Sequence, residues 1–162
     1  MLIGSKEIFG IQFEITQISQ KSILWGKISL WVDNKFIGKY DEETMISVFN
    51  CTLFDIRHSN KNISNDLSLL ELIRSRDIDA LQEREDSFYI LQLGETFDGF
   101  RLSIVYNMDK VVFCWELDKR RMKDHIGYPE GVQLGVVDKN IFNAVVDEYI
   151  GNLPKVKLYF AP

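Results

Sequence analysis

The chain has 162 residues, of which 46% are hydrophobic, so it can bury one sizeable core without a metal ion or a disulfide. Cys51 and Cys114 are too far apart in sequence to form a CxxC redox pair or half of a zinc site, and we expect two buried, reduced thiols. The start of the chain lacks a basic leader followed by an apolar run, and no apolar stretch approaches the roughly 20 residues of a membrane span. We therefore expect a cytoplasmic protein that does not bind membranes.

Negative charge is concentrated in the middle of the chain. The formal net charge is −5, and the segment from Glu71 to Asp98 contains eight acids and three bases, which accounts for that excess by itself. A partner attracted by this segment is expected to be basic.

The first 40 residues show the pattern of a three-stranded meander. Apolar and polar residues alternate over 8–15 and again over 24–32, as half-buried strands require. Turn-forming residues at 33–35 then lead into a short strand over 36–40.

The next part of the chain is predicted to be helical. Asp41 is a candidate N-cap for a helix whose apolar residues recur at helical spacing from Met45 to Ile56. A polar loop follows over 59–65, Asp66 begins a shorter helix, and one more helical turn is predicted over 78–81.

Strands return in the C-terminal half. The apolar run over 88–93 predicts a strand buried on both faces, and the alternation over 100–106 and 111–117 predicts a hairpin. The remaining expectations are a strand over 132–137, a helix capped by Asp138 and ended by Gly151, and an edge strand over 155–160.

These elements predict an α+β fold in which residues 1–162 form a single domain. Because hairpin-like strands lie at both ends of the chain around a helical middle, we expect an antiparallel sheet of about five to seven strands with helices packed on one face.

No catalytic set is recognisable. The chain has two histidines, His58 and His125, and on the predicted helix Cys51 lies about 10 Å along the axis from His58, too far for a hydrogen-bonded pair. Glycine-rich phosphate loops, HExxH, GxSxG and the twelve-residue calcium loop do not occur. We therefore expect no enzyme activity, no cofactor and no metal site.

Two further patterns each allow two interpretations. The basic run at 119–123 is flanked by acids in a chain whose pI is about 5.1, which favours a solvated loop over a nucleic-acid site. Trp25 and Trp31 share one face of a predicted strand, where a helix covers them or they form an exposed aromatic patch of the kind found at binding hot spots. Burial is the more frequent outcome.

Short motifs along nearly the whole chain resemble a known family. The first group is Ile3-Gly4, residues 8–15, residues 24–28, the turn at 33–35 and Ile37-Gly38. The second group is residues 97–100, residues 112–115, and Phe142 with Val145 in the last helix. Together they resemble the forty-second numbered immunity protein family of bacterial polymorphic-toxin and contact-dependent inhibition systems.

The resemblance implies a cytoplasmic protein that binds a cognate toxin domain stoichiometrically and neutralises it, the toxin often being a nuclease. It supplies no catalytic residues and no contact residues. A nuclease tends to have a basic cleft, so the charge pattern leads us to expect partner-binding residues in the acidic segment, namely Asp77, Asp79, Glu83, Glu85 and Asp86. The alternatives are a non-toxin adaptor or ligand-binding module and a small carboxylate-dependent hydrolase.

Overall fold

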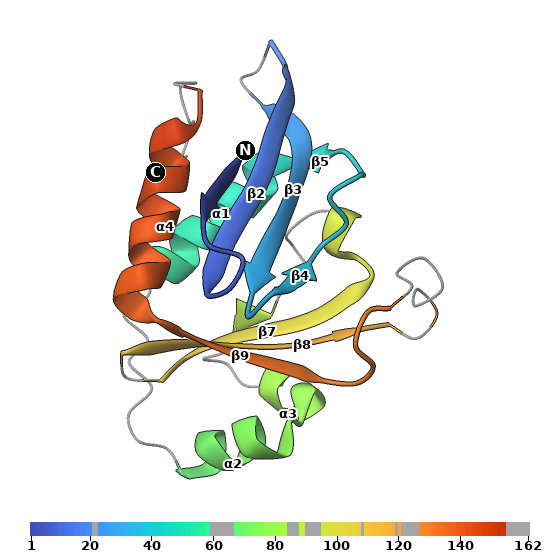
Figure 1. The fold of residues 1–162 in the computed structure, drawn as a ribbon, viewed down its shortest axis with the longest axis vertical. Helices are drawn as coiled ribbons and strands as arrows, with labels where there is room; N and C mark the ends of the chain where they lie inside the picture. The colour runs from blue at the N-terminus through green and yellow to red at the C-terminus, as the bar shows by residue number, and fades with distance from the viewer. Residues whose placement is uncertain are drawn as a thin grey trace.

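The structure is a computed structural model and describes residues 1–20, 23–58, 67–83, 88–89, 95–107, 109–118, 120 and 127–154. Figure 1 shows how the helices and strands of these residues are arranged. Strands pair into two separate antiparallel sheets, which we call sheet A and sheet B.

Sheet A is formed by the N-terminal part of the chain. Its strand order is β1-β2-β3-β4, and β5 also pairs with β3. The strands are β1 (Leu2–Gly4), β2 (Phe9–Ile18), β3 (Leu24–Val32), β4 (Lys35–Ile37) and β5 (Thr44–Met45). Asp33 and Asn34 connect β3 to β4 with φ angles of 52° and 60°, as a type I′ hairpin turn requires. The predicted meander is confirmed.

Sheet B is formed by later segments in the order β6-β7-β8-β9. Its strands are β6 (Phe88–Tyr89), β7 (Phe100–Asn107), β8 (Lys110–Leu117) and β9 (Gln133–Asp138). The predicted hairpin is β7 with β8, in which Phe100 is opposite Leu117 and Asn107 is opposite Lys110. The short 3-10 helix η1 (Glu95–Phe97) precedes β7.

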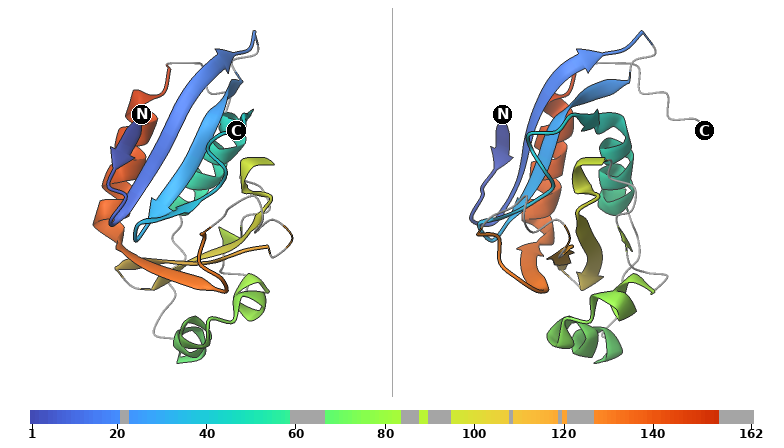
Figure 2. Two further views of the ribbon diagram at one scale, coloured as in Figure 1. Left: turned by 45° about the vertical axis from the view of Figure 1, so that its right-hand side comes forward. Right: turned by 90° about the vertical axis from the view of Figure 1, so that its right-hand side faces the viewer.

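Two helices cover the inner face of sheet A. They are α1 (Ile46–His58) and α4 (Lys139–Asn152). Figure 1 shows α1 behind the sheet and α4 along its left side, and the right view of Figure 2 shows both on the same side of it. Asp138 caps α4 as predicted, since its side chain accepts a hydrogen bond of 2.9 Å from the backbone N–H of Asn140. The main core consists of apolar side chains from α1, α4, the inner face of sheet A and one face of sheet B.

Two shorter helices lie on the opposite face of sheet B. These are α2 (Leu67–Ser75) and α3 (Ile78–Gln82), which lie below sheet B in Figure 1. Their contact with the sheet is a second, smaller cluster of buried residues: Ile73, Ile78, Leu81, Val105, Val112 and Cys114. Sheet B is therefore packed on both faces.

The α+β class is confirmed, but the strands form two sheets where one was expected. The alternating pattern predicts each hairpin and does not determine which hairpins share a sheet. The two sheets meet where β9 crosses the end of β3, and a Cβ atom on Gly135 would overlap the Cγ1 methyl of Val32.

Of three further expectations, one was wrong and two fall wholly or partly outside the described residues. Asp41 is not an N-cap, because Thr44 and Met45 pair with β3 and α1 begins only at Ile46. The strand predicted over 88–93 is described only at Phe88–Tyr89. The edge strand predicted over 155–160 lies outside the described residues.

Candidate functional site

The described residues contain no assembled catalytic set. No group of three or more His, Cys, Asp or Glu side chains in this part of the chain could hold a metal ion. His58 is exposed at the end of α1, where Nδ1 lies 2.9 Å from the backbone oxygen of Phe54, and His125 lies outside the described residues. No helix among the described residues is long and apolar enough to cross a membrane.

The two cysteines differ in their surroundings. Cys51 is exposed on α1, so the expectation that it is buried was wrong, because its position on the helix faces solvent. Cys114 is buried beneath α2 and α3, and burial raises the pKa of its thiol to about 11. A thiol with such a raised pKa is a poor nucleophile at neutral pH.

Three of the five predicted partner-binding acids lie on or beside α3. Asp77 is the N-cap of this helix, and its carboxylate accepts a hydrogen bond of 3.0 Å from the backbone N–H of Ala80. Asp79 forms an ion pair with Arg101 of β7. Glu83 is exposed at the end of the helix, and Glu85 and Asp86 lie outside the described residues.

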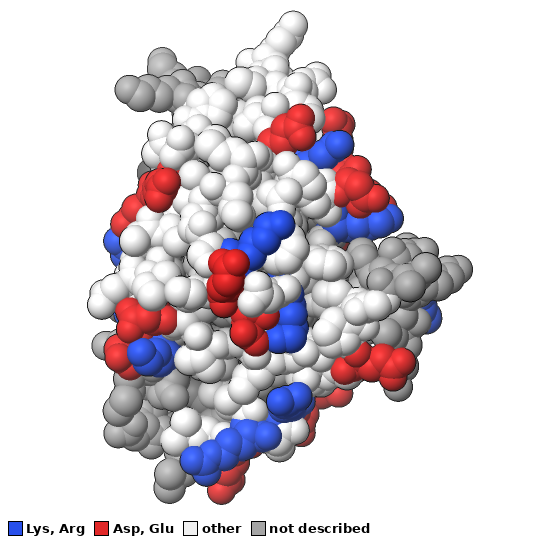
Figure 3. Space-filling view, in the orientation of Figure 1, with Lys and Arg blue, Asp and Glu red and all other residues white. Residues whose placement is uncertain are grey.

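The acids of this segment do not form one continuous negative surface among the described residues. Arg101 also lies 3.4 Å from Glu116, so Asp79 belongs to a local charge network. Asp98, the last acid of the segment, follows η1 at a distance from α3 along the chain. On the face drawn in Figure 3, acidic and basic side chains are intermixed, with neither sign forming a separate area.

The outer face of sheet A, opposite α1 and α4, is a second candidate surface. Among the described residues no helix covers it (Figures 1 and 2). Trp25 and Trp31 both point to this side of β3, and each is half-buried. Of the two interpretations of this pattern, the one with a covering helix is therefore excluded for the described helices, and the two tryptophans are only half-buried.

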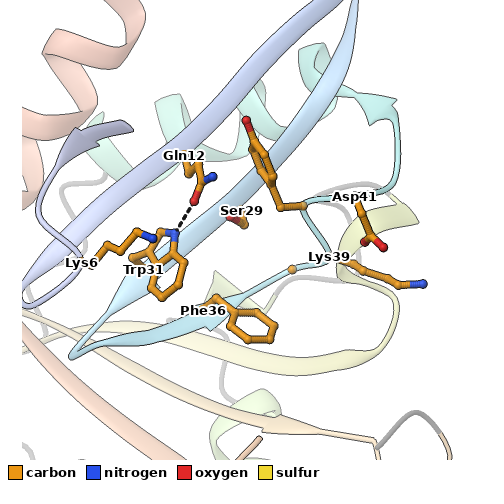
Figure 4. Close-up of a pocket in the computed structure, with 9 residues that line it drawn as sticks. Lys6, Gln12, Ser29, Trp31, Phe36, Lys39 and Asp41 are labelled. Atoms are coloured by element: carbon orange, nitrogen blue, oxygen red, sulfur yellow. Dashed lines mark hydrogen bonds between the residues drawn. The ribbon is translucent and has the colours of Figure 1, made fainter. Parts of the chain in front are cut away.

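A pocket of about 380 Å³ opens on the outer face of sheet A and is drawn in Figure 4. We call it the Trp31 pocket; it is lined by Lys6, Gln12, Ser29, Trp31, Phe36, Gly38, Lys39, Tyr40 and Asp41. It contains one carboxylate, so it does not bring together the pair of acids that a carboxylate-dependent hydrolase needs.

Trp31 is fixed in the pocket by three neighbours. Its indole N–H donates a hydrogen bond of 2.9 Å to Oε1 of Gln12, and its ring lies 5.9 Å from that of Phe36 in an edge-on arrangement. The ammonium group of Lys6 lies 4.0 Å from the centre of the Trp31 ring, within cation–π range. Figure 4 shows Lys6, Gln12 and Phe36 around the indole.

Ser29 lies beside Trp31 on the same face of β3. The residue is 1% exposed, and its hydroxyl has no hydrogen-bond partner among the described residues. The pocket-lining loop is held by Thr96, because the backbone N–H of Lys39 donates to the carbonyl oxygen of Thr96 at 2.8 Å. Sequence reasoning identified Trp31 from strand alternation, but nothing local to the sequence predicted that the chain after β4 folds back to complete a pocket.

Comparison with known proteins gives two findings. The family model described as Immunity protein 42 matches residues 1–152. The crystal structure of CdiI from Burkholderia dolosa AUO158 superposes with a TM-score of 0.60, covering 94% of this chain and 100% of that chain at 11% identity, which shows a shared fold. A comparison with curated proteins found no match.

Proposed function

Because the chain belongs to the Immunity protein 42 family, whose model matches residues 1–152, we propose that it binds its cognate toxin domain stoichiometrically and blocks it. The family resemblance stated from the sequence is confirmed, and the protein is a toxin-neutralising immunity protein. The family match is the observation on which the proposal depends. It also supports three finer proposals: residues 1–162 form one domain, the protein acts in the cytoplasm, and it has no catalytic activity of its own.

We further propose that the toxin is a nuclease with a basic cleft. A domain that grips nucleic acid neutralises phosphates with lysine and arginine side chains. The chain has a net charge of −5, and opposite net charge speeds association between two proteins. This charge relationship supports a basic partner.

The acidic segment remains our proposal for the surface that attracts this partner. Asp77 and Asp79 already have partners within the protein, so their carboxylates contribute less to an external field than Glu83. Glu83 is exposed and forms no ion pair with the described residues. The proposed contact therefore centres on Glu83, together with Glu85 and Asp86 that follow it in sequence.

The first test is co-expression of this protein with its toxin domain, which we expect a neighbouring gene to encode. We expect a one-to-one complex in size-exclusion chromatography with light scattering, and recovery of growth in cells that express the toxin. A toxin that stays active, with no complex formed, would contradict the proposed function.

The second test isolates the charge contribution. Glu83→Lys should lower the association rate constant and weaken its dependence on salt, because a rim charge acts mainly during encounter. Glu148→Lys makes the same charge change at an exposed position on α4 and is the matched control. Equal association rates for the two variants would remove Glu83 from the toxin contact.

A further inference from the structure

We propose that the Trp31 pocket is the anchor site for the toxin, an inference that depends on the proposed function. Its occupant is a toxin loop that lays an apolar side chain against the rings of Trp31 and Phe36. The same loop places oxygen acceptors, from backbone carbonyls or carboxylates, at the hydroxyl of Ser29 and the ammonium group of Lys6. Three features support this inference: the uncovered face of sheet A, the buried hydroxyl of Ser29, and the ammonium group of Lys6.

The first observation is that no described helix covers the outer face of sheet A, where Trp31 lies. Both faces of sheet B are packed, and the inner face of sheet A is covered by α1 and α4. Trp31 nevertheless stays half-buried on the outer face of sheet A. Figure 2 shows no described helix over that face. Tryptophan is one of the residue types enriched among the few residues that dominate binding energy at protein interfaces.

The second observation is the hydroxyl of Ser29. A buried hydroxyl without a partner destabilises a protein. Ser29 is one of the residues that line the pocket, and its hydroxyl is buried with no partner among the described side chains or backbone groups. We infer that the Ser29 hydroxyl turns toward the pocket when the toxin binds and donates a hydrogen bond to an acceptor that the toxin supplies. This selects a loop with an exposed carbonyl or carboxylate over a purely apolar partner.

The third observation is the charge of Lys6. Its ammonium group lies over the Trp31 ring and forms no ion pair with any carboxylate of the described residues. A partner that covers this cation without an acceptor would leave it desolvated and unpaired, which is costly. Charge complementarity therefore places an acidic or carbonyl oxygen of the toxin at this side of the pocket.

The pocket is also rigid before binding. The pocket-lining residue Gly38 has a φ of 99°, and a side chain there would collide with the ring of Phe97 in η1. Lys39 next to it is held by Thr96. Because these contacts fix the backbone of this lining loop in the free protein, ordering the loop costs little conformational entropy when a partner enters.

The main experiment compares Trp31→Ala with Trp25→Ala, using the wild-type protein and the same toxin domain. Trp25 is half-buried on the same face of the same strand but does not line the pocket, which makes it a matched control. We expect Trp31→Ala to raise Kd about 30-fold or more, mainly through faster dissociation. Trp25→Ala should change Kd by less than about threefold. Circular dichroism establishes that both variants fold.

A second pair of variants keeps the test decisive if Trp31→Ala fails to fold. Ser29→Ala removes an unpaired buried hydroxyl, so we expect a Tm about 2–4 °C higher together with a raised Kd. Thr44 also has a buried hydroxyl with no partner among the described residues, but it lies outside the pocket. Thr44→Val should raise Tm without changing Kd. A merely structural role of Ser29 would give the same result for both variants.

Charge reversal completes the design. Lys6→Glu should raise Kd, whereas Lys27→Glu, on the same face but outside the pocket, should leave it nearly unchanged. If the wild-type protein binds the toxin and the pocket variants bind equally well, the anchor site is overturned while the proposed function stands. If the wild-type protein does not bind, both are overturned. A free protein that is dimeric until Trp31 is replaced would assign the pocket to a second copy of this chain and overturn the toxin anchor.

Discussion

The indole N–H of Trp115 donates a hydrogen bond of 2.7 Å to the hydroxyl of Tyr128, which donates in turn to the backbone carbonyl of Phe36 at 2.7 Å. Trp115 lies on β8 in sheet B, and Phe36 lies on β4 in sheet A. One hydroxyl group therefore links the two sheets close to the Trp31 pocket, which Phe36 lines.

Tyr128→Phe should destabilise the protein. The substitution leaves the buried N–H of Trp115 and the carbonyl of Phe36 without this partner, and we expect the free energy of unfolding to fall by about 2 kcal/mol. Urea denaturation followed by tryptophan fluorescence measures the change. Tyr40→Phe removes a hydroxyl for which no hydrogen bond is described, so it is the control and should stay within about 0.5 kcal/mol of wild type. Equal effects of both substitutions would exclude a specific role for the link.

The same hydroxyl predicts a loss of stability at alkaline pH. Burial raises the pKa of Tyr128 to about 12 from a usual value of 10.0. As the pH rises from 10 to 12, the unfolded chain loses this proton first, so the free energy of unfolding falls by up to about 1.4 kcal/mol per pH unit. Urea midpoints at pH 8 and pH 11 should therefore differ less in Tyr128→Phe than in wild type. An identical decrease in the two proteins would show that other groups cause the loss.

Gly135→Ala should also lower stability, because Gly135 lies where the two sheets are in contact. Its new Cβ would overlap the Cγ1 methyl of Val32, and we expect a cost of about 1–3 kcal/mol. Gly151→Ala, in α4, meets nothing within 4 Å and should stabilise the protein by about 0.5 kcal/mol. Thermal unfolding of the two variants should therefore shift in opposite directions, and a Gly135→Ala protein as stable as wild type would mean that the sheets can separate at little cost.

The two thiols should react at very different rates. In the native protein at neutral pH, a thiol reagent should modify exposed Cys51 quickly and buried Cys114 slowly, because few molecules carry a Cys114 thiolate. We expect one equivalent to react rapidly and a second only after addition of denaturant. The Cys51→Ser variant should show no fast phase, and a fast phase in that variant would show that α2 and α3 do not cover Cys114.

The parts of the fold that depend on neighbouring residues could be predicted from the sequence. The turn at Asp33 and Asn34, the β7–β8 hairpin and the Asp138 cap each depend on a few adjacent side chains. The division into two sheets could not, because it depends on contacts such as Gly135 with Val32, which are distant in sequence. The start of α1 was misplaced because pairing of Thr44 and Met45 with β3 overrides the capping preference of Asp41.

The sequence predicted the position of Trp31 but not the pocket around it. Strand alternation placed Trp31 on the face opposite the aliphatic residues. The pocket around it needs the β3–β4 turn to bring Phe36 alongside Trp31, and it needs Thr96 to hold Lys39 from 57 positions away. The distribution of charged residues in the sequence located the acidic segment. It could not show that Asp79 forms an ion pair with Arg101, which is distant in sequence.

The separate cluster beneath α2 and α3 has a consequence for how the molecule opens. Its six buried residues are distinct from those of the main core, so we expect the two helices to detach from sheet B more readily than α1 and α4 detach from sheet A. Amide protons in α2 and α3 should then exchange with deuterium at a lower free energy than those in β2 and β3. The protein is expected to behave as two cooperative units that pack on opposite faces of sheet B, one containing α1, α4 and sheet A, and the other containing α2 and α3.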